Sequence, residues 1–154
     1  MSEHANALLL RRLFTSLDAR DHQAMTDCYA SSATFHDIAF DLRDRRGIEA
    51  MWRMICTKSP VKVTIEHIEA DDRAGCARIV DNYTFSDTDA PVVNRIESRF
   101  RFERGRIVEH RDECDERKWA EQAFGPGPKG WLVGRFRPLR AWKAKSKLRP
   151  YLKP

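Results

Sequence analysis

Three side chains suited to acid–base or metal chemistry alternate along one short stretch of the sequence. They are His110, Asp112 and Cys114 in "VEHRDEC". Alternate residues of a strand point to the same side, so these side chains should share a face. If that face is interior, the apolar surroundings disfavour a charged carboxyl, which makes Asp112 a candidate general acid or base. A structural Asp held by Arg or backbone donors is the alternative, and the sequence leaves both open.

The same three residues also offer metal-ligand atoms. A structural zinc site needs four ligands, which usually come from closely spaced Cys or His pairs. The sequence contains no HxH, HExxH or CxxC pattern. It also has no phosphate-binding glycine loop, no serine elbow and no dinucleotide signature. We therefore expect neither a metal nor a cofactor.

Further candidates lie elsewhere in the chain. Asp37 in "TFHDIAF" is a second carboxyl that precedes an apolar pair. Asp81 and Tyr83 share one face of a strand, where they either serve a site or order a sheet edge. Trp52 and Trp119 lie on helices and favour pocket or core packing. We predict Asp112, Asp37 and His110 as catalytic, and a second group as substrate-binding: Tyr83, Asp81, Trp52, Ser98, Phe100 and Trp119.

The elements that must position these residues follow from hydrophobic periodicity. Apolar residues at helical spacing predict helices over 5–18 and 21–30, the second capped by Asp21. A short strand at "ATFHDIAF" follows, and then a third helix that begins after Gly47 and stops before Pro60. From residue 61 the period changes to two, with Val61, Val63, Ile65 and His67 on one face.

The clearest alternation lies in the strand that contains residues 94–103. Its apolar and small side chains occupy one face and its charged side chains the other, which indicates a half-buried strand. A turn at "ERGR" returns the chain antiparallel, with Val108 expected beside His110 on the inner face. Asp115 then caps a short helix that ends at Gly125. The layout predicts an α+β domain: a strongly curved antiparallel sheet packed against three N-terminal helices, forming a cone that encloses a pocket.

Composition limits the class of protein. The chain has 154 residues, 42% apolar and 33% charged, as expected for a single folded domain. No apolar run approaches the ~20 residues of a membrane span, and the first residues lack the layout of a secretory signal. We expect a cytoplasmic protein whose four isolated cysteines are reduced.

Charge is distributed unevenly. Residues 1–128 carry 19 Lys/Arg against 23 Asp/Glu, whereas residues 129–154 carry nine Lys/Arg and no acid. We expect no nucleic acid at the acidic body. The basic tail, 135–154, predicts a short amphipathic helix that Pro150 stops. This tail could pack on the body or on a dimer partner, stay disordered, or contact an anionic lipid or nucleic acid.

Three stretches resemble the nuclear transport factor 2-like superfamily, particularly its SnoaL-like and ketosteroid isomerase-like members. They are "LLLRRLFTSLDARDHQAMTDCYASSATFHD", "RFRFERGRIVEHRDECD" and "WAEQAFG". The resemblance covers roughly residues 5–134, and we take 1–134 as the SnoaL-like domain. It implies the cone-shaped fold and a homodimer through the exposed sheet face. It implies less about function, because the fold hosts isomerases, cyclases, epoxide hydrolases, dehydratases and non-catalytic binders.

The resemblance carries over to some site residues and not to others. Asp37 falls where ketosteroid isomerases have their proton-shuttling Asp, although Ile38 replaces the usual Pro. The oxyanion-hole Tyr and protonated Asp of those enzymes would fall near Leu13 and Ser98, so both are missing. Asp112 falls at the catalytic Asp of SnoaL-like cyclases and limonene epoxide hydrolase-like enzymes.

The epoxide hydrolase-like enzymes add an Arg and a second Asp on an earlier strand. Arg78 and Asp81 are spaced one residue off that pattern, so they face opposite sides of a regular strand. We therefore expect a cofactor-independent acid–base enzyme of isomerase, cyclase or hydrolase type. Its substrate would be a small apolar, carbonyl-bearing or polycyclic molecule. The alternative is a non-catalytic small-molecule-binding or dimerisation module of the same fold.

Overall fold

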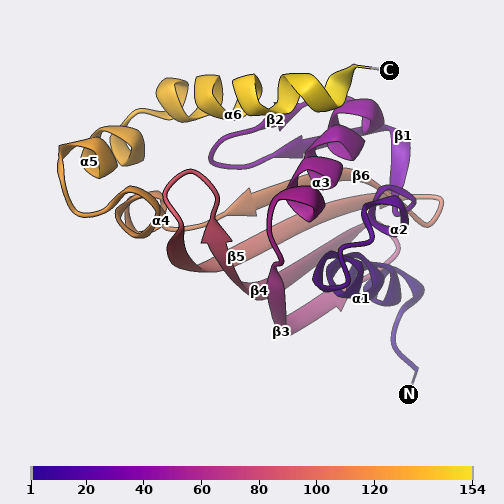
Figure 1. The fold of residues 1–154 in the computed structure, drawn as a ribbon. Helices are drawn as coiled ribbons and strands as arrows, with labels where there is room; N and C mark the ends of the chain where they lie inside the picture. Colours follow the sequence, from indigo (N-terminus) through magenta and orange to yellow (C-terminus); the bar gives the residue numbers. More distant parts are fainter. Residues whose placement is uncertain (1, 154) are drawn as a thin grey trace.

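The computed structural model describes residues 2–153 (Figure 1). Three helices and two strands occupy the N-terminal third of the chain, a four-strand meander follows, and three helices form the C-terminal quarter. In chain order the elements are α1 Ala5–Asp18, α2 His22–Thr26, β1 Tyr29–His36, β2 Asp41–Leu42, α3 Arg45–Lys58, β3 Lys62–Ala70, β4 Ala74–Phe85, β5 Ala90–Glu103, β6 Arg106–Glu113, α4 Glu116–Phe124, α5 Pro128–Arg135 and α6 Arg137–Leu152.

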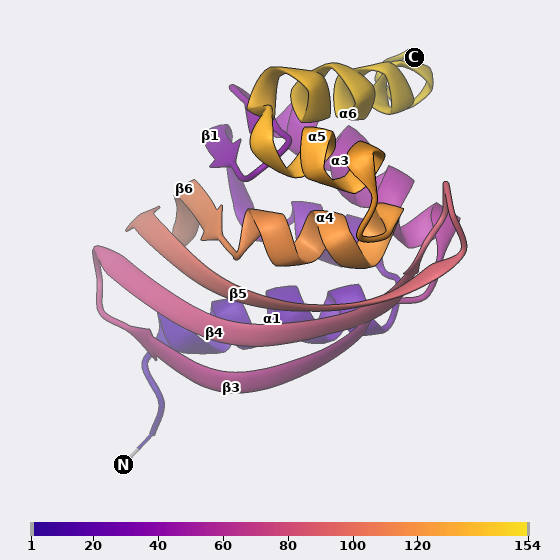
Figure 2. The ribbon, with the colours of Figure 1, turned by 90° about the vertical axis from the view of Figure 1, so that its left-hand side faces the viewer.

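The strands form one curved, unclosed sheet in the order β2-β1-β6-β5-β4-β3. Figure 2 shows β3, β4 and β5 strongly bent, with α4 on their concave side. The expected α+β architecture is confirmed, with one correction. The sheet is mixed and not purely antiparallel, because β1 pairs with β6 in parallel. The long excursion through α3 and the meander brings β6 back beside β1 in the same direction.

Aspartates begin three of the helices. Asp21, Asp44 and Asp115 each accept a hydrogen bond from the backbone N–H three residues further on. Such a cap stabilises a helix by about 1 kcal/mol. The sequence predicted the caps at Asp21 and Asp115. The second helix is shorter than expected, because β1 already begins at Tyr29.

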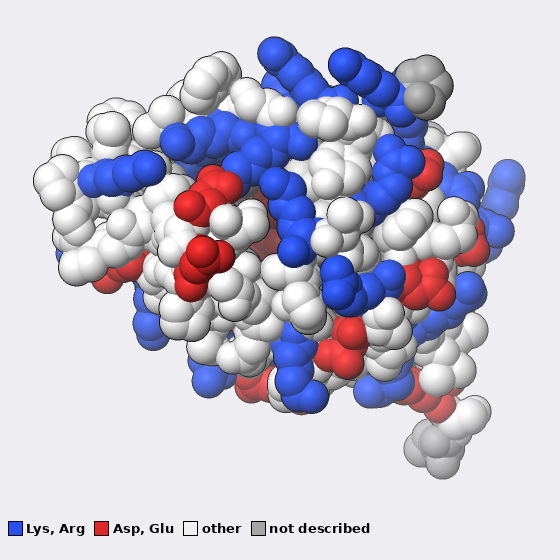
Figure 3. Space-filling view, viewed as in Figure 1, with Lys and Arg blue, Asp and Glu red and all other residues white. Residues whose placement is uncertain are grey.

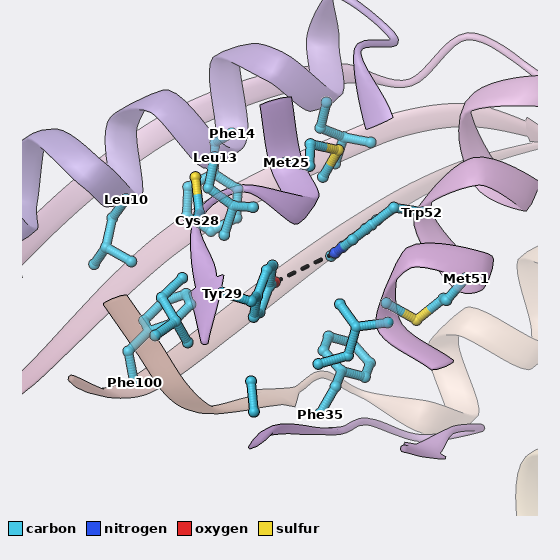
Figure 4. Close-up of a cluster of buried hydrophobic side chains, with 14 of the residues drawn as sticks. Leu10, Leu13, Phe14, Met25, Cys28, Tyr29, Phe35, Met51, Trp52 and Phe100 are labelled. Atoms are coloured by element: carbon cyan, nitrogen blue, oxygen red, sulfur yellow. Dashed lines mark hydrogen bonds between the residues drawn. The ribbon is translucent and has the colours of Figure 1, made fainter. Parts of the chain in front are cut away.

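The main core lies between the inner face of the sheet and α1, α2 and α3 (Figure 4). Phe14 of α1 meets Phe100 of β5 edge to face, with ring centroids 6.2 Å apart. Phe35 of β1 meets Trp52 of α3 in the same way at 5.8 Å. These contacts fix α1 and α3 against the sheet, and α3 thereby becomes a wall of the space that remains inside the cone.

The alternation in β5 is as predicted, but two register shifts change the neighbouring strands. The β3–β4 pairing shifts between Ile65 and His67, which leaves His67 exposed and not on the inner face. The β5–β6 pairing shifts after Arg101, and Ile107 is fully buried where Val108 was expected. One extra residue turns every following side chain to the opposite face.

The C-terminal segment differs most from expectation. Helix α5 was not predicted, and α6 continues through Pro150 to Leu152. Two arginines of α3 support the last turn of α6: Arg46 donates to the carbonyl of Leu152, and Arg53 donates to that of Tyr151. The segment 135–154 therefore packs on the body of its own chain as far as it is described. Across residues 2–153, no helix is both long and apolar enough to cross a membrane.

Candidate active site

A cavity of about 260 Å³ lies inside the cone, enclosed by the inner face of the sheet, α3, α4 and α6. Its wall is mainly apolar and aromatic, with contributions from Phe35, Trp52 and Trp119. Four carboxyl side chains also line it: Asp37, Asp81 and Asp112 from three different strand regions, and Asp87, which forms an ion pair with Lys147. A mainly apolar cavity with a few convergent polar groups is the usual form of a small-molecule site.

Asp112 near the end of β6 is held through a single oxygen. Its Oδ1 accepts a hydrogen bond from Ser98 Oγ at 2.5 Å and lies 2.7 Å from His110 Nε2. The side chain is 13% exposed, so it borders the cavity and is shielded from bulk water. Two donors on Oδ1 stabilise negative charge on the carboxyl and leave Oδ2 for a ligand.

His110 lies beneath Asp112 and is completely buried. Its Nδ1 is 2.8 Å from the Tyr29 hydroxyl. That hydroxyl in turn accepts a hydrogen bond from Trp52 Nε1 at 3.3 Å, the dashed line in Figure 4. Because Trp52 is a donor, the Tyr29 proton is free to reach His110 Nδ1, and Nε2 then carries the hydrogen that faces Asp112. Burial raises the pKa of Tyr29, so its hydroxyl keeps that proton. The network therefore orients the imidazole towards Asp112.

Asp81 of β4 lacks the hydrogen-bond donors that hold Asp112. It is 9% exposed, and its Oδ1 has no hydrogen-bond partner among the residues that the structure describes. Burial raises the pKa of Asp81 to about 7, with a further contribution from the negative charge of Asp112. A carboxyl with this pKa holds a proton about half of the time near neutral pH. An unpaired buried oxygen beside a cavity is also an open position for a ligand donor.

Asp37 follows the end of β1 and is half-buried. Burial raises its pKa to about 6, although its Oδ1 accepts hydrogen bonds from the backbone N–H groups of Ala39 at 2.8 Å and Phe40 at 2.6 Å. These bonds close a tight turn, and Ile38 occupies the position after Asp37. Asp37 is therefore both a turn-forming residue and a second cavity carboxyl that can hold a proton.

Tyr83 and Trp119 form a polar pair on the cavity wall. Trp119 Nε1 of α4 donates a hydrogen bond to the Tyr83 hydroxyl at 2.8 Å. Burial raises the pKa of Tyr83 to about 12. The hydroxyl therefore stays protonated and, having accepted from Trp119, it can donate to a ligand oxygen.

Comparison with known proteins identifies the family. A model described as a SnoaL-like domain matches residues 10–110, about two thirds of the chain. The chain belongs to the SnoaL-like domain family. Among curated proteins, none matches its sequence.

Solved structures share the fold of this SnoaL-like protein. An LEH-like epoxide hydrolase of M. tuberculosis is 20% identical with a TM-score of 0.65, covering 85% of this chain and 92% of that one. A Streptomyces antibioticus protein described as a candidate polyketide cyclase is 21% identical (TM-score 0.65; 77% and 98% covered). A Catenulispora acidiphila protein of ketosteroid isomerase-like fold, in complex with trimethylamine, is 15% identical (TM-score 0.68; 77% and 93% covered). These likenesses show the fold alone.

The cavity of the SnoaL-like protein brings together six of the nine predicted site residues: Asp37, Trp52, Asp81, Tyr83, Asp112 and Trp119. The other three, Ser98, Phe100 and His110, lie behind the cavity wall. Ser98 is 1% exposed and bonds Asp112, while the Phe100 ring packs 4.3 Å from that of His110. A ligand in the cavity would reach Asp112 and would not touch these three.

Sequence reasoning missed the contribution of α6 to the cavity wall: Arg140, Lys143, Ala144 and Lys147. Arg140 is 3% exposed and bonds three carbonyls and Glu116, so it anchors α6. The pattern of apolar residues among basic neighbours indicated an amphipathic helix here. It could not indicate which surface the helix covers.

Potential metal ligands gather away from the cavity. Within residues 2–153 one such group is found, in which ligand atoms of His67, Glu69 and Cys76 lie within 4.8 Å of one another. All three side chains lie on the outer face of β3 and β4, and His67 pairs with Glu69 at 3.5 Å. These residues contribute nothing to the wall of the cavity.

Proposed function

We propose that this SnoaL-like protein is a cofactor-independent acid–base enzyme that acts on a small, largely apolar molecule in the cavity. One observation carries the proposal. Asp112, held by two donors, shares an apolar cavity with Asp81, a buried carboxyl that has a raised pKa and one oxygen unpaired within the described part of the chain. A carboxyl with one oxygen held by two donors and a neighbouring carboxyl that can carry a proton are suited to act as base and acid.

In this proposal Asp112 is the general base. Ser98 and His110 hold its Oδ1, so Oδ2 takes a proton from the substrate or from a water that attacks it. Asp81 is the general acid, and it returns a proton to a developing oxyanion or leaving oxygen. Tyr83 donates a hydrogen bond to the same kind of oxygen, and Asp37 is a second proton donor below its pKa of about 6.

The charge pattern of the cavity favours an enzyme over a passive binding module. In a binding module the cavity carboxylates would be neutralised by salt bridges with Lys or Arg. Of the four cavity carboxylates, Asp87 forms such a salt bridge, with Lys147; in the part of the chain that the structure describes, Asp37, Asp81 and Asp112 form none. The names of the structural relatives, an epoxide hydrolase and a candidate polyketide cyclase, denote reactions that carboxyl groups can catalyse by proton transfer.

The test begins with the molecule that the protein retains on purification, identified by native mass spectrometry. That molecule and close analogues are incubated with wild type, Asp112→Asn and the exposed control Asp72→Asn. We expect turnover by wild type and control, and a loss of about 100-fold or more in kcat for Asp112→Asn. Retained turnover in Asp112→Asn removes Asp112 from the base role. Binding without turnover by wild type replaces the enzyme with the binding module.

A further inference from the structure

The C-terminal helix α6 lies outside the family-matched residues 10–110 but forms one side of the cavity. It therefore supplies cavity groups that the family resemblance does not specify. The charged residues that α6 contributes to the wall are all cations: Arg140, Lys143 and Lys147. Lys58 at the end of α3 adds a fourth cation. Figure 3 shows blue side chains beside a hollow on this face of the molecule.

Two of these four cations are already neutralised. The guanidinium of Arg140 bonds Glu116 at 2.8 Å and the carbonyls of Ile38, Val133 and Gly134. The ammonium of Lys147 forms an ion pair with Asp87 in the β4–β5 turn. Neither has a free charge to offer a ligand.

Lys143 has a different environment. Its Nζ lies over the ring of Phe124, 5.9 Å from the centroid, and this ring is itself part of the cavity wall. Within residues 2–153, Lys143 forms no salt bridge, and the exposed Lys58 forms none either. Lys143 is half-buried, so its charge is less screened by solvent than that of Lys58. The cavity therefore contains one partly shielded, uncompensated ammonium.

We propose that the molecule accepted by the cavity carries an anionic group, such as a carboxylate, which Lys143 recognises. This inference rests on the proposed function for the identity of the site. The apolar wall would take the body of the molecule, and the ammonium would take its charged end. Repulsion from the cavity carboxyls is limited at about pH 6, because Asp81 is then largely protonated, Asp37 is about half protonated, and Asp87 is paired with Lys147. The acid–base groups would then work on an uncharged part of the substrate.

The test compares two probes of nearly equal shape, 1-naphthylacetate and 1-naphthylacetamide, by calorimetry at about pH 6, where a free carboxylic acid is ionised. For the wild-type protein we expect the acetate to bind at least about fivefold more tightly than the amide, as for one partly screened ion pair. This preference should shrink as salt is added.

Two methionine variants on α6 distinguish a specific contact between Lys143 and the anionic group from the overall positive charge of the helix. Lys143→Met should abolish the preference for the acetate and leave amide binding unchanged. Lys145→Met removes the same charge from an exposed position outside the cavity wall and should keep the preference. Three results would overturn the inference. The acetate could bind no better than the amide, the preference for the acetate could fall equally in both variants, or neither probe could bind. Loss of turnover in Asp112→Asn is measured separately, so the two proposals can fail independently.

Discussion

His110 Nε2 lies 2.7 Å from Asp112 Oδ1, although the two residues are only two positions apart on one strand. Side chains at this spacing point to the same face, and here the deeper one supports the outer one. His110 is fully buried, whereas Asp112 borders the cavity. The pair therefore consists of a carboxyl available to a ligand and an imidazole that orients it.

Replacing His110 by Phe tests this orienting role. The ring volume is kept, but the donor to Asp112 is lost. We expect kcat to fall about 10- to 100-fold through misplacement of the carboxyl, with KM nearly unchanged. Tyr29→Phe is the control, because it removes a bond on the far side of the imidazole and should affect kcat less. Equal effects of both variants on kcat would assign His110 a purely structural role.

The raised pKa of Asp81 predicts a pH-dependent stability. Its folded-state pKa of about 7 exceeds the ordinary value of 3.8, so the native state binds more protons than the unfolded state between these limits. The stabilisation is complete below the ordinary value and is lost as pH rises through about 7. Relative to Asp81→Asn, the wild type should lose a few kcal/mol (~1.4 per pKa unit) between pH 4 and 8. Guanidinium unfolding at several pH values measures this difference, and parallel curves for the two proteins would contradict it.

Substitution of Phe100 tests whether this residue packs in the core or contacts the ligand. The side chain is 3% exposed and packs against Phe14 and His110, away from the cavity. Phe100→Leu should destabilise the protein by about 1–2 kcal/mol, less than the 3–5 expected for truncation to Ala, and leave ligand affinity nearly unchanged. Trp119→Leu is the matched case on the cavity wall, and it should weaken ligand binding. Thermal unfolding and calorimetry give the two quantities, and a larger affinity loss for Phe100→Leu would place that residue in the binding site.

Arg140 holds α6 in place. Arg140→Met leaves Glu116 and three backbone carbonyls without their donor, so we expect a loss of about 2–4 kcal/mol or local release of the helix. Hydrogen exchange should then become faster across 137–152, while Arg149→Met at an exposed position leaves exchange unchanged. Unaltered protection in Arg140→Met would show that other contacts suffice to hold α6.

Several features were predictable because they depend on local sequence. The alternation from Asn94 to Glu103 defines the faces of β5, and Asp21 and Asp115 cap the helices that follow them. Features that depend on pairing between distant segments could not be predicted from the sequence. The inner positions of β3 and β6 are shifted by irregular registers that place His67 outside and Ile107 inside. The continuation of α6 through Pro150 likewise depends on arginines of α3 that support its last turn.

For the candidate site, the sequence by itself determined which residue types were available and, by strand alternation, that His110 and Asp112 share a face. The tertiary structure decided their roles. It placed His110 behind Asp112, left an oxygen of Asp81 without a partner among residues 2–153, and brought Lys143 from the far end of the chain to the same cavity. The physical reason is that alternation is a property of one backbone segment. Burial, hydrogen-bond satisfaction and charge compensation depend on groups that other segments bring, and only folding determines which groups those are.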